Sequence, residues 1–75
     1  MENGTTSGAI TVSINGEPRL VPEAMALDAL LQDLGLQPQK VAVERNLAVV
    51  PKSLYPKTEL QAGDRLEIVH FVGGG

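Results

Sequence analysis

The sequence predicts an α+β roll, a fold in which β-hairpins pack over a single helix. Three observations support this prediction. Apolar and polar residues alternate in separate short segments, as they do in half-buried strands. One central segment repeats its leucines with helical spacing, and Asn15-Gly16 marks a tight hairpin turn. The expected order is strand, strand, helix, strand, short strand, strand.

The first two strands are expected to form a hairpin. Apolar residues at every second position predict a half-buried strand with Ile10, Val12 and Ile14 on one face. Asn15-Gly16 suits the positive φ values of a type I′ turn. Because Pro18 has no backbone N–H, we expect the return strand, residues 19–21, to lie at an edge of the sheet or to follow a looser loop.

The helix is predicted by leucines at i, i+3, i+4 and i+7, which form one apolar stripe of Leu27, Leu30, Leu31 and Leu34. Gly35 is expected to end it, because glycine readily adopts the left-handed conformation found after helix C-termini. Ala26, at the expected N-cap, has no side-chain acceptor for the first turn. We therefore expect the start of this helix to fray.

The second half of the chain predicts a strand, a short strand with a helical turn, and a final strand. Val41 and Val43 share one face of the first strand, and Asn46 marks the turn after it. Pro51 and Pro56 confine the next part to a short strand at residues 49–50 and one helical turn over residues 53–55. The last strand is expected over residues 65–72.

Composition argues against several classes of function. The chain has 75 residues, a formal net charge of −3, one histidine and no cysteine. An acidic protein is a poor partner for nucleic acid or anionic membranes, which attract clustered Lys and Arg. A structural metal site and a cysteine or Ser-His nucleophile are not expected from this composition. No membrane span or signal peptide is recognisable, so we expect a cytoplasmic protein.

The chain divides into three parts. Residues 1–8 are small and polar, and we interpret them as a disordered N-terminal extension or an expression remnant. Residues 9–72 are expected to hold the folded domain. Residues 73–75 are three glycines, expected to form a flexible C-terminal tail. A strand that leads directly into residues without side chains makes this end the first candidate functional segment.

Four stretches resemble the sulfur carriers of thiamine biosynthesis, a family of ubiquitin-like β-grasp proteins. They are the Asn15-Gly16 hairpin, LDALLQDLGL at residues 27–36, VAVERN at 41–46 and GDRLEIVHFVGGG at 63–75. The resemblance covers residues 10–75 and implies a β-grasp roll, with a mixed sheet of four to five strands packed on one helix. Ala26, where the family often has Thr or Ser, and the N-terminal extension depart from the family pattern.

The resemblance implies a protein co-substrate and not an enzyme. An E1-like adenylyltransferase would use ATP to adenylate Gly75, and sulfur from a cysteine desulfurase would convert it to a thiocarboxylate. This sulfur would then pass to a thiazole synthase. The chain itself would bind no cofactor or metal. Gly73 and Gly74, which have no Cβ, would thread a narrow channel in the partner.

The outward face of the last strand is the expected docking surface. If Leu66 and Ile68 pack on the helix, alternate residues emerge on the opposite side, where one helix leaves the sheet uncovered. We expect partner docking by Val69, Phe71, Val72 and Ala42; the alternative is a second packed face. His70 lies beside the tail, and we expect it to serve packing or hydrogen bonding; assistance to the chemistry is the alternative.

Other functions remain open. A molybdopterin-type or tRNA-thiolating carrier shares the fold and the diglycine end, and only VERN and IVHFVGGG favour thiamine. A static β-grasp binding module would use its glycines only as a loose end. We expect Glu44-Arg45-Asn46 to be structural, as a charged strand end and a turn, and a docking motif is the alternative. Tyr55 is expected to pack beneath its loop.

Overall fold

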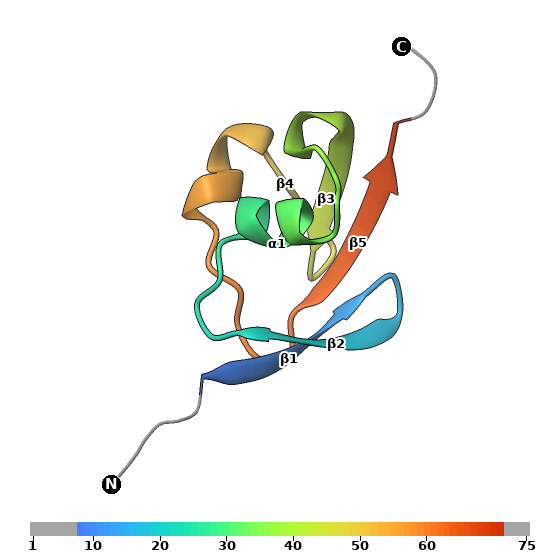
Figure 1. Ribbon diagram of the computed structural model, residues 1–75. Coiled ribbons are helices and arrows are strands. Elements are labelled where there is room, and N and C mark those ends of the chain that lie inside the picture. The colour runs from blue at the N-terminus through green and yellow to red at the C-terminus, as the bar shows by residue number, and fades with distance from the viewer. Residues whose placement is uncertain (1–7, 72–75) are drawn as a thin grey trace, which may run out of the picture.

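One helix crosses one face of a five-stranded sheet in the computed structural model, which describes residues 8–71 (Figure 1). The strands lie in the order β2-β1-β5-β3-β4, with β1 and β5 parallel and the other neighbours antiparallel. The predicted α+β roll is confirmed. Its elements are β1 (Ala9–Ile14), β2 (Glu17–Pro22), α1 (Leu27–Asp33), the 3₁₀ helix η2 (Pro38–Lys40), β3 (Val41–Arg45), β4 (Ala48–Val50), the 3₁₀ helix η3 (Lys52–Lys57) and β5 (Arg65–His70).

The β1–β2 hairpin has the predicted turn. Asn15 and Gly16 have φ values of 50° and 87° and separate the paired residues Ile14 and Glu17, as in a two-residue type I′ loop. β2 lies at the sheet edge, as expected, but it is longer than the predicted residues 19–21. Pro18 can belong to it because an edge strand has a side on which no N–H is needed.

Both ends of α1 are held by backbone hydrogen bonds. Ala26 provides no side-chain cap, as predicted, but the Leu27 N–H donates to the Thr58 carbonyl at 2.8 Å, which satisfies one donor of the first turn. Gly35, with φ of 80°, follows the helix and donates to Gln32, while the Leu36 N–H donates to Leu31. This pair of bonds is a Schellman motif and ends the helix at the expected glycine.

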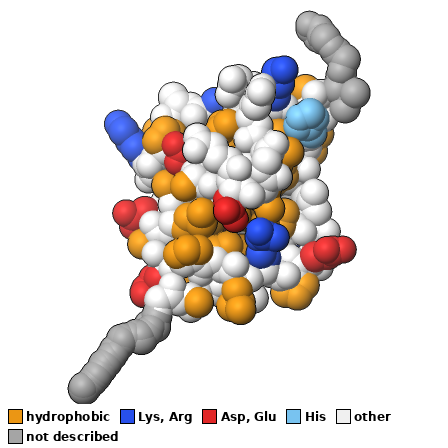
Figure 2. Space-filling view, viewed as in Figure 1, with side chains coloured by type: hydrophobic (Ala, Val, Ile, Leu, Met, Phe, Trp, Pro, Cys, Tyr) orange, Lys and Arg blue, Asp and Glu red, His pale blue; other side chains and the backbone are white. Residues whose placement is uncertain are grey.

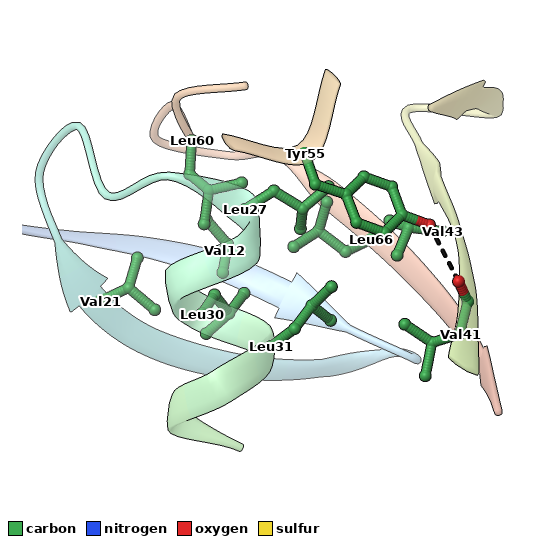
Figure 3. Packing of buried hydrophobic residues seen from close by; sticks show 10 residues of the cluster. All are labelled: Val12, Val21, Leu27, Leu30, Leu31, Val41, Val43, Tyr55, Leu60 and Leu66. Atoms are coloured by element: carbon green, nitrogen blue, oxygen red, sulfur yellow. Dashed lines mark hydrogen bonds between the residues drawn. The ribbon is translucent and has the colours of Figure 1, made fainter. Parts of the chain in front are cut away.

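The core lies between α1 and the sheet (Figure 3). The helix contributes Leu27, Leu30 and Leu31, all fully buried. Tyr55 is also buried, and its hydroxyl donates to the Val41 carbonyl at 3.0 Å, which confirms its expected packing beneath the loop. The other buried apolar residues are Val12, Val21, Val41, Val43, Leu60 and Leu66. Among residues 8–71, no helix covers the opposite face of the sheet.

The β3–β4 turn contains a strained, exposed leucine. Asn46 and Leu47 have φ values of 52° and 74°, and Leu47 is 89% exposed. Asparagine tolerates this left-handed region, whereas a leucine there pays about 1 to 2 kcal/mol because its Cβ approaches the backbone. Because the Leu47 side chain is exposed, burial in the core does not offset this backbone strain.

Replacing Leu47 with glycine is expected to raise the free energy of unfolding by about 1 kcal/mol, because glycine adopts this φ without a Cβ clash. Urea denaturation measures the change. Leu47→Ala is the matched control, since it removes the exposed side chain but keeps the Cβ, and its stability should equal that of the parent protein. An equal gain in both variants would show that the exposed side chain, and not the backbone strain, is unfavourable.

Candidate functional site

β5 leads toward the C-terminal glycines and lies inside the sheet, between β1 and β3. It pairs with β1 only at its beginning, through Ser13↔Arg65 and Ile14↔Leu66. Its pairing with β3 continues to Val41↔His70, and the Phe71 N–H then donates to the Lys40 carbonyl at 2.9 Å. The strand ends at His70, two residues before the predicted end, and Val72 lies outside the described residues. β3 therefore holds the chain as far as Phe71.

The Asn15 side chain extends the contact between β1 and β5. Its Oδ1 accepts from the Ile68 N–H at 2.7 Å, and its Nδ2 donates to the Ile68 carbonyl at 3.2 Å. The Asn15 side-chain amide thus makes the hydrogen bonds to β5 that one more residue of β1 would have made. It does so at the point where the chain turns into β2. The sequence revealed the turn at Asn15 but not this second role, because the partner lies 53 positions away.

Asp64 fixes the start of β5. It is only 5% exposed and accepts hydrogen bonds from Arg45 Nε at 2.9 Å, Asn46 Nδ2 at 3.1 Å and the Gln61 N–H at 2.8 Å. Asn46 Oδ1 in turn accepts from the Arg65 N–H at 2.9 Å. The structural role expected for Arg45 and Asn46 is confirmed. Sequence reasoning missed Asp64 as their shared partner.

The environment of Asp64 makes the stability of the fold depend on pH in the acid range. Burial by itself raises the pKa of this carboxyl, but hydrogen bonds from Gln61, Asn46 and Arg45, together with the positive charge of Arg45, outweigh burial and hold the pKa below its usual value. A carboxyl with a depressed folded-state pKa stabilises the protein fully above its unfolded-state value of about 3.9. This contribution is lost as the pH falls through the folded-state pKa.

The uncovered face of the sheet brings together part of the predicted docking patch. Ala42 lies opposite Val69 in the β3–β5 register, so their side chains share one face. Val69 is 60% exposed, Phe71 is 54% exposed and Ala42 is half-buried. Lys52 Nζ lies 4.9 Å from the centre of the Phe71 ring, which links the end of β5 to η3. The role of these residues in docking stays a prediction.

Other predicted site residues fall at the end of the described range or beyond it. Gly73, Gly74 and Gly75 lie outside the described residues. His70 is exposed at the end of β5, so it does not pack in the core, and its expected alternative role in hydrogen bonding stays a prediction. Gly8 was assigned to the N-terminal extension, but its carbonyl accepts from the Glu23 N–H at 2.7 Å beside the first hairpin.

Side chains of opposite charge are interspersed with apolar ones on the face drawn in Figure 2. Within residues 8–71, no three His, Cys, Asp or Glu side chains gather where they could hold a metal ion. None of the helices in that range has the length and hydrophobicity needed to pass through a bilayer.

A β2-β1-β5-β3-β4 sheet packed on one helix, with the central β5 leading to glycines, defines a ubiquitin-like β-grasp protein. The model of the ThiS family matches residues 12–75. The chain therefore belongs to the ThiS family, as the resemblance in its sequence predicted.

Known proteins similar to this chain include a structure and two curated sequences. The crystal structure of a thiamine biosynthesis protein (ThiS) from Geobacter metallireducens superposes with a TM-score of 0.75 at 32% identity, covering 88% of this chain and all of the other. The sulfur carrier protein ThiS of Bacillus subtilis is 48% identical over 61% of this chain and 70% of its own. A thiazole synthase of Paramagnetospirillum magneticum is 55% identical over 83% of this chain, which spans only 19% of that relative's length.

Asp64→Asn is expected to lower the free energy of unfolding at pH 7 by about 1 to 3 kcal/mol, because the amide cannot accept all three hydrogen bonds of the buried carboxylate. The loss of stability below about pH 4 should also become shallower, since Asp64 no longer titrates. Denaturant unfolding at several pH values measures both effects.

Asp33→Asn provides the control for this prediction. Its carboxylate also faces an arginine, Arg19, at 3.5 Å, but the two side chains are 60% and 45% exposed. Exposed pairs contribute little, so this variant should change stability by less than about 0.5 kcal/mol. Equal losses in the two variants, or an unchanged acid slope for Asp64→Asn, would contradict the account of Asp64.

Proposed function

We propose that the chain is a sulfur carrier protein of thiamine biosynthesis, acting in the cytoplasm as a co-substrate and not as an enzyme. Membership of the ThiS family and similarity to the Bacillus subtilis sulfur carrier support this function. The observation that carries it is the geometry of β5. The strand has an uncovered face at Val69 and is held by β3 up to Phe71, four positions before Gly75.

The reaction begins at the carboxylate of Gly75. A terminal carboxyl has a pKa of about 3.3 to 3.7, so at neutral pH it is an anion and a poor electrophile. An E1-like adenylyltransferase supplies ATP; the carboxylate attacks the α-phosphorus, and pyrophosphate leaves. A persulfide sulfur from a cysteine desulfurase then displaces AMP, and a thiol splits the resulting S–S bond to leave the thiocarboxylate. ATP is the partner's substrate, and this chain binds no cofactor.

The folded part and the glycines have separate tasks in this proposal. Docking through Val69, Phe71, Val72 and Ala42 holds the Gly75 carboxylate beside the bound ATP. Its attack on the α-phosphorus then becomes effectively intramolecular. Fully extended, four residues reach at most about 14 Å beyond Phe71, far enough to enter a partner's active site. Glycines pass a narrow channel because they have no Cβ, although ordering them costs about 1 to 2 kcal/mol per residue.

The acceptor of the sulfur is proposed to be a thiazole synthase. The Paramagnetospirillum magneticum protein of that name contains a segment similar to 83% of this chain. That segment makes up 19% of the relative's length. In this relative, a segment similar to the chain is part of a protein named for thiazole synthesis. This favours thiamine biosynthesis over the molybdopterin-type and tRNA-thiolating alternatives.

Incubation with ATP, the adenylyltransferase and a sulfur donor is expected to exchange one oxygen of Gly75 for sulfur. Intact-mass spectrometry measures the exchange, and fragmentation locates it. Gly74→Leu should retain the fold but block the reaction, because a side chain at this position closes the channel to the reactive end. Circular dichroism and thermal unfolding verify the fold of this variant.

An unchanged mass with a partner that activates another carrier of the family would overturn the proposal and favour a static binding module. Full modification of Gly74→Leu would contradict the role of the glycines. Pathway choice is tested by deleting the gene. Growth restored by the thiazole precursor supports thiamine biosynthesis, whereas a requirement for molybdopterin or thiolated tRNA would support one of the alternatives.

A further inference from the structure

An acidic row crosses the uncovered face of the sheet. In register, Glu44 of β3 lies opposite Val49 of β4 on one side and opposite Glu67 of β5 on the other. Residues paired in this way point to the same face. All three are exposed, and Val49 is 71% exposed. The row is next to the Ala42–Val69 pair and farther from the tail.

The two glutamates of this row repel each other. Like charges directly opposite on neighbouring strands are unfavourable. The ion pairs among residues 8–71 are Arg19–Asp33 and Arg45–Asp64, so neither glutamate has an ion-pair partner in that part of the chain. Arg65 borders a hollow of about 210 Å³ together with Glu67, but it forms no ion pair with it. Within residues 8–71, no ion pair therefore offsets this repulsion.

Leu47 adds a second unfavourable feature to the same region. It borders the hollow shared by Arg65 and Glu67 and is both strained and almost fully exposed. Strained backbone at an exposed turn and facing like charges both lower folding stability. Where local choices conflict with the stability of the fold, a functional demand is the expected reason.

We propose that Glu44, Glu67, Val49 and Leu47 form a docking surface for the thiazole synthase. A Lys or Arg of the synthase inserts between the two glutamates, and apolar side chains around it cover Val49 and Leu47. Charge complementarity specifies the cation, because a positive group between the carboxylates replaces their repulsion with attraction to both. The inference rests on the proposed sulfur carrier function.

The choice of synthase as the occupant follows from two observations. The acidic row is continuous with the Ala42–Val69 pair that leads toward the tail, so one partner can cover both while Gly75 enters its active site. In the Paramagnetospirillum magneticum relative, a segment similar to this chain belongs to the same polypeptide as the thiazole synthase. A carrier surface that faces the synthase is expected in such a protein.

The test compares Glu44→Gln/Glu67→Gln with the parent chain in calorimetric titrations against its thiazole synthase. The double variant should bind about tenfold more weakly, since its paired carboxylates no longer attract the partner's cation. Its thermal midpoint should rise by about 1 to 4 °C, because the repulsion is removed. A more stable protein that binds less well separates docking from any structural role.

Glu23→Gln/Glu59→Gln is the matched control. It removes the same charge, but these residues border a different hollow, with Ile10 and Leu60. Its affinity should equal that of the parent chain. Equal weakening in both double variants would mean that net charge alone matters and would overturn the inference.

Three further outcomes would also overturn it. Unchanged affinity of Glu44→Gln/Glu67→Gln, with normal thiocarboxylate formation, would reject the docking surface and leave the carrier function intact. Self-association of the parent chain in analytical ultracentrifugation, lost in this variant, would assign the surface to a second copy. A parent chain that neither binds the synthase nor forms a thiocarboxylate would overturn both the docking surface and the proposed function.

Discussion

The pairing of β5 between β1 and β3 is the constraint on which the rest of the structure depends. Asp64 anchors the start of this strand through Arg45 and Asn46, and Asn15 holds its middle through Ile68. Beyond that point, β3 is the one strand among residues 8–71 that pairs with it. A central strand is paired on both sides and is therefore the most restrained part of a sheet. The residue at which such a strand ends has a defined position. This pairing fixes the position of the chain as far as Phe71, four positions before Gly75.

A single short helix gives the sheet two different faces. α1 has seven residues and buries three leucines on one face, where they meet the core residues of the sheet. The opposite face keeps Val49 and Val69 exposed together with two facing glutamates. In a chain this small, a second packed layer would add stability. The uncovered face instead leaves apolar surface and charge exposed to solvent, and the proposed function assigns this surface to partner proteins.

Sequence periodicity predicted the elements, their order and much of the candidate face, whereas the β-grasp arrangement was implied by the family resemblance. Alternation placed Val41 and Val43 inside and Val69 outside, and the glycine signals located the hairpin turn and the helix end. The long-range polar contacts were not predictable in the same way. The bonds of Asn15 with Ile68 and of Asp64 with Arg45 join residues far apart in sequence, and they depend on a register that composition does not encode.

Leu47 and the facing glutamates show another limit of reading elements one at a time. Each residue is unremarkable in its own segment, and Leu47 follows a good turn residue, Asn46. The conflict becomes visible only when φ values and strand register are known, because both features depend on how the elements meet.

The central claim is that the sheet face recognises the partner whereas the tail reacts, and Val69→Asp tests it most directly. The rate of thiocarboxylate formation is measured against carrier concentration, with Leu20→Asp as a control at an equally apolar position that is 71% exposed on the edge strand β2. The account predicts that Val69→Asp raises KM about tenfold with an unchanged kcat, because docking alone is weakened, and that Leu20→Asp changes neither. A lower kcat at an unchanged KM, or equal effects of the two variants, would contradict it.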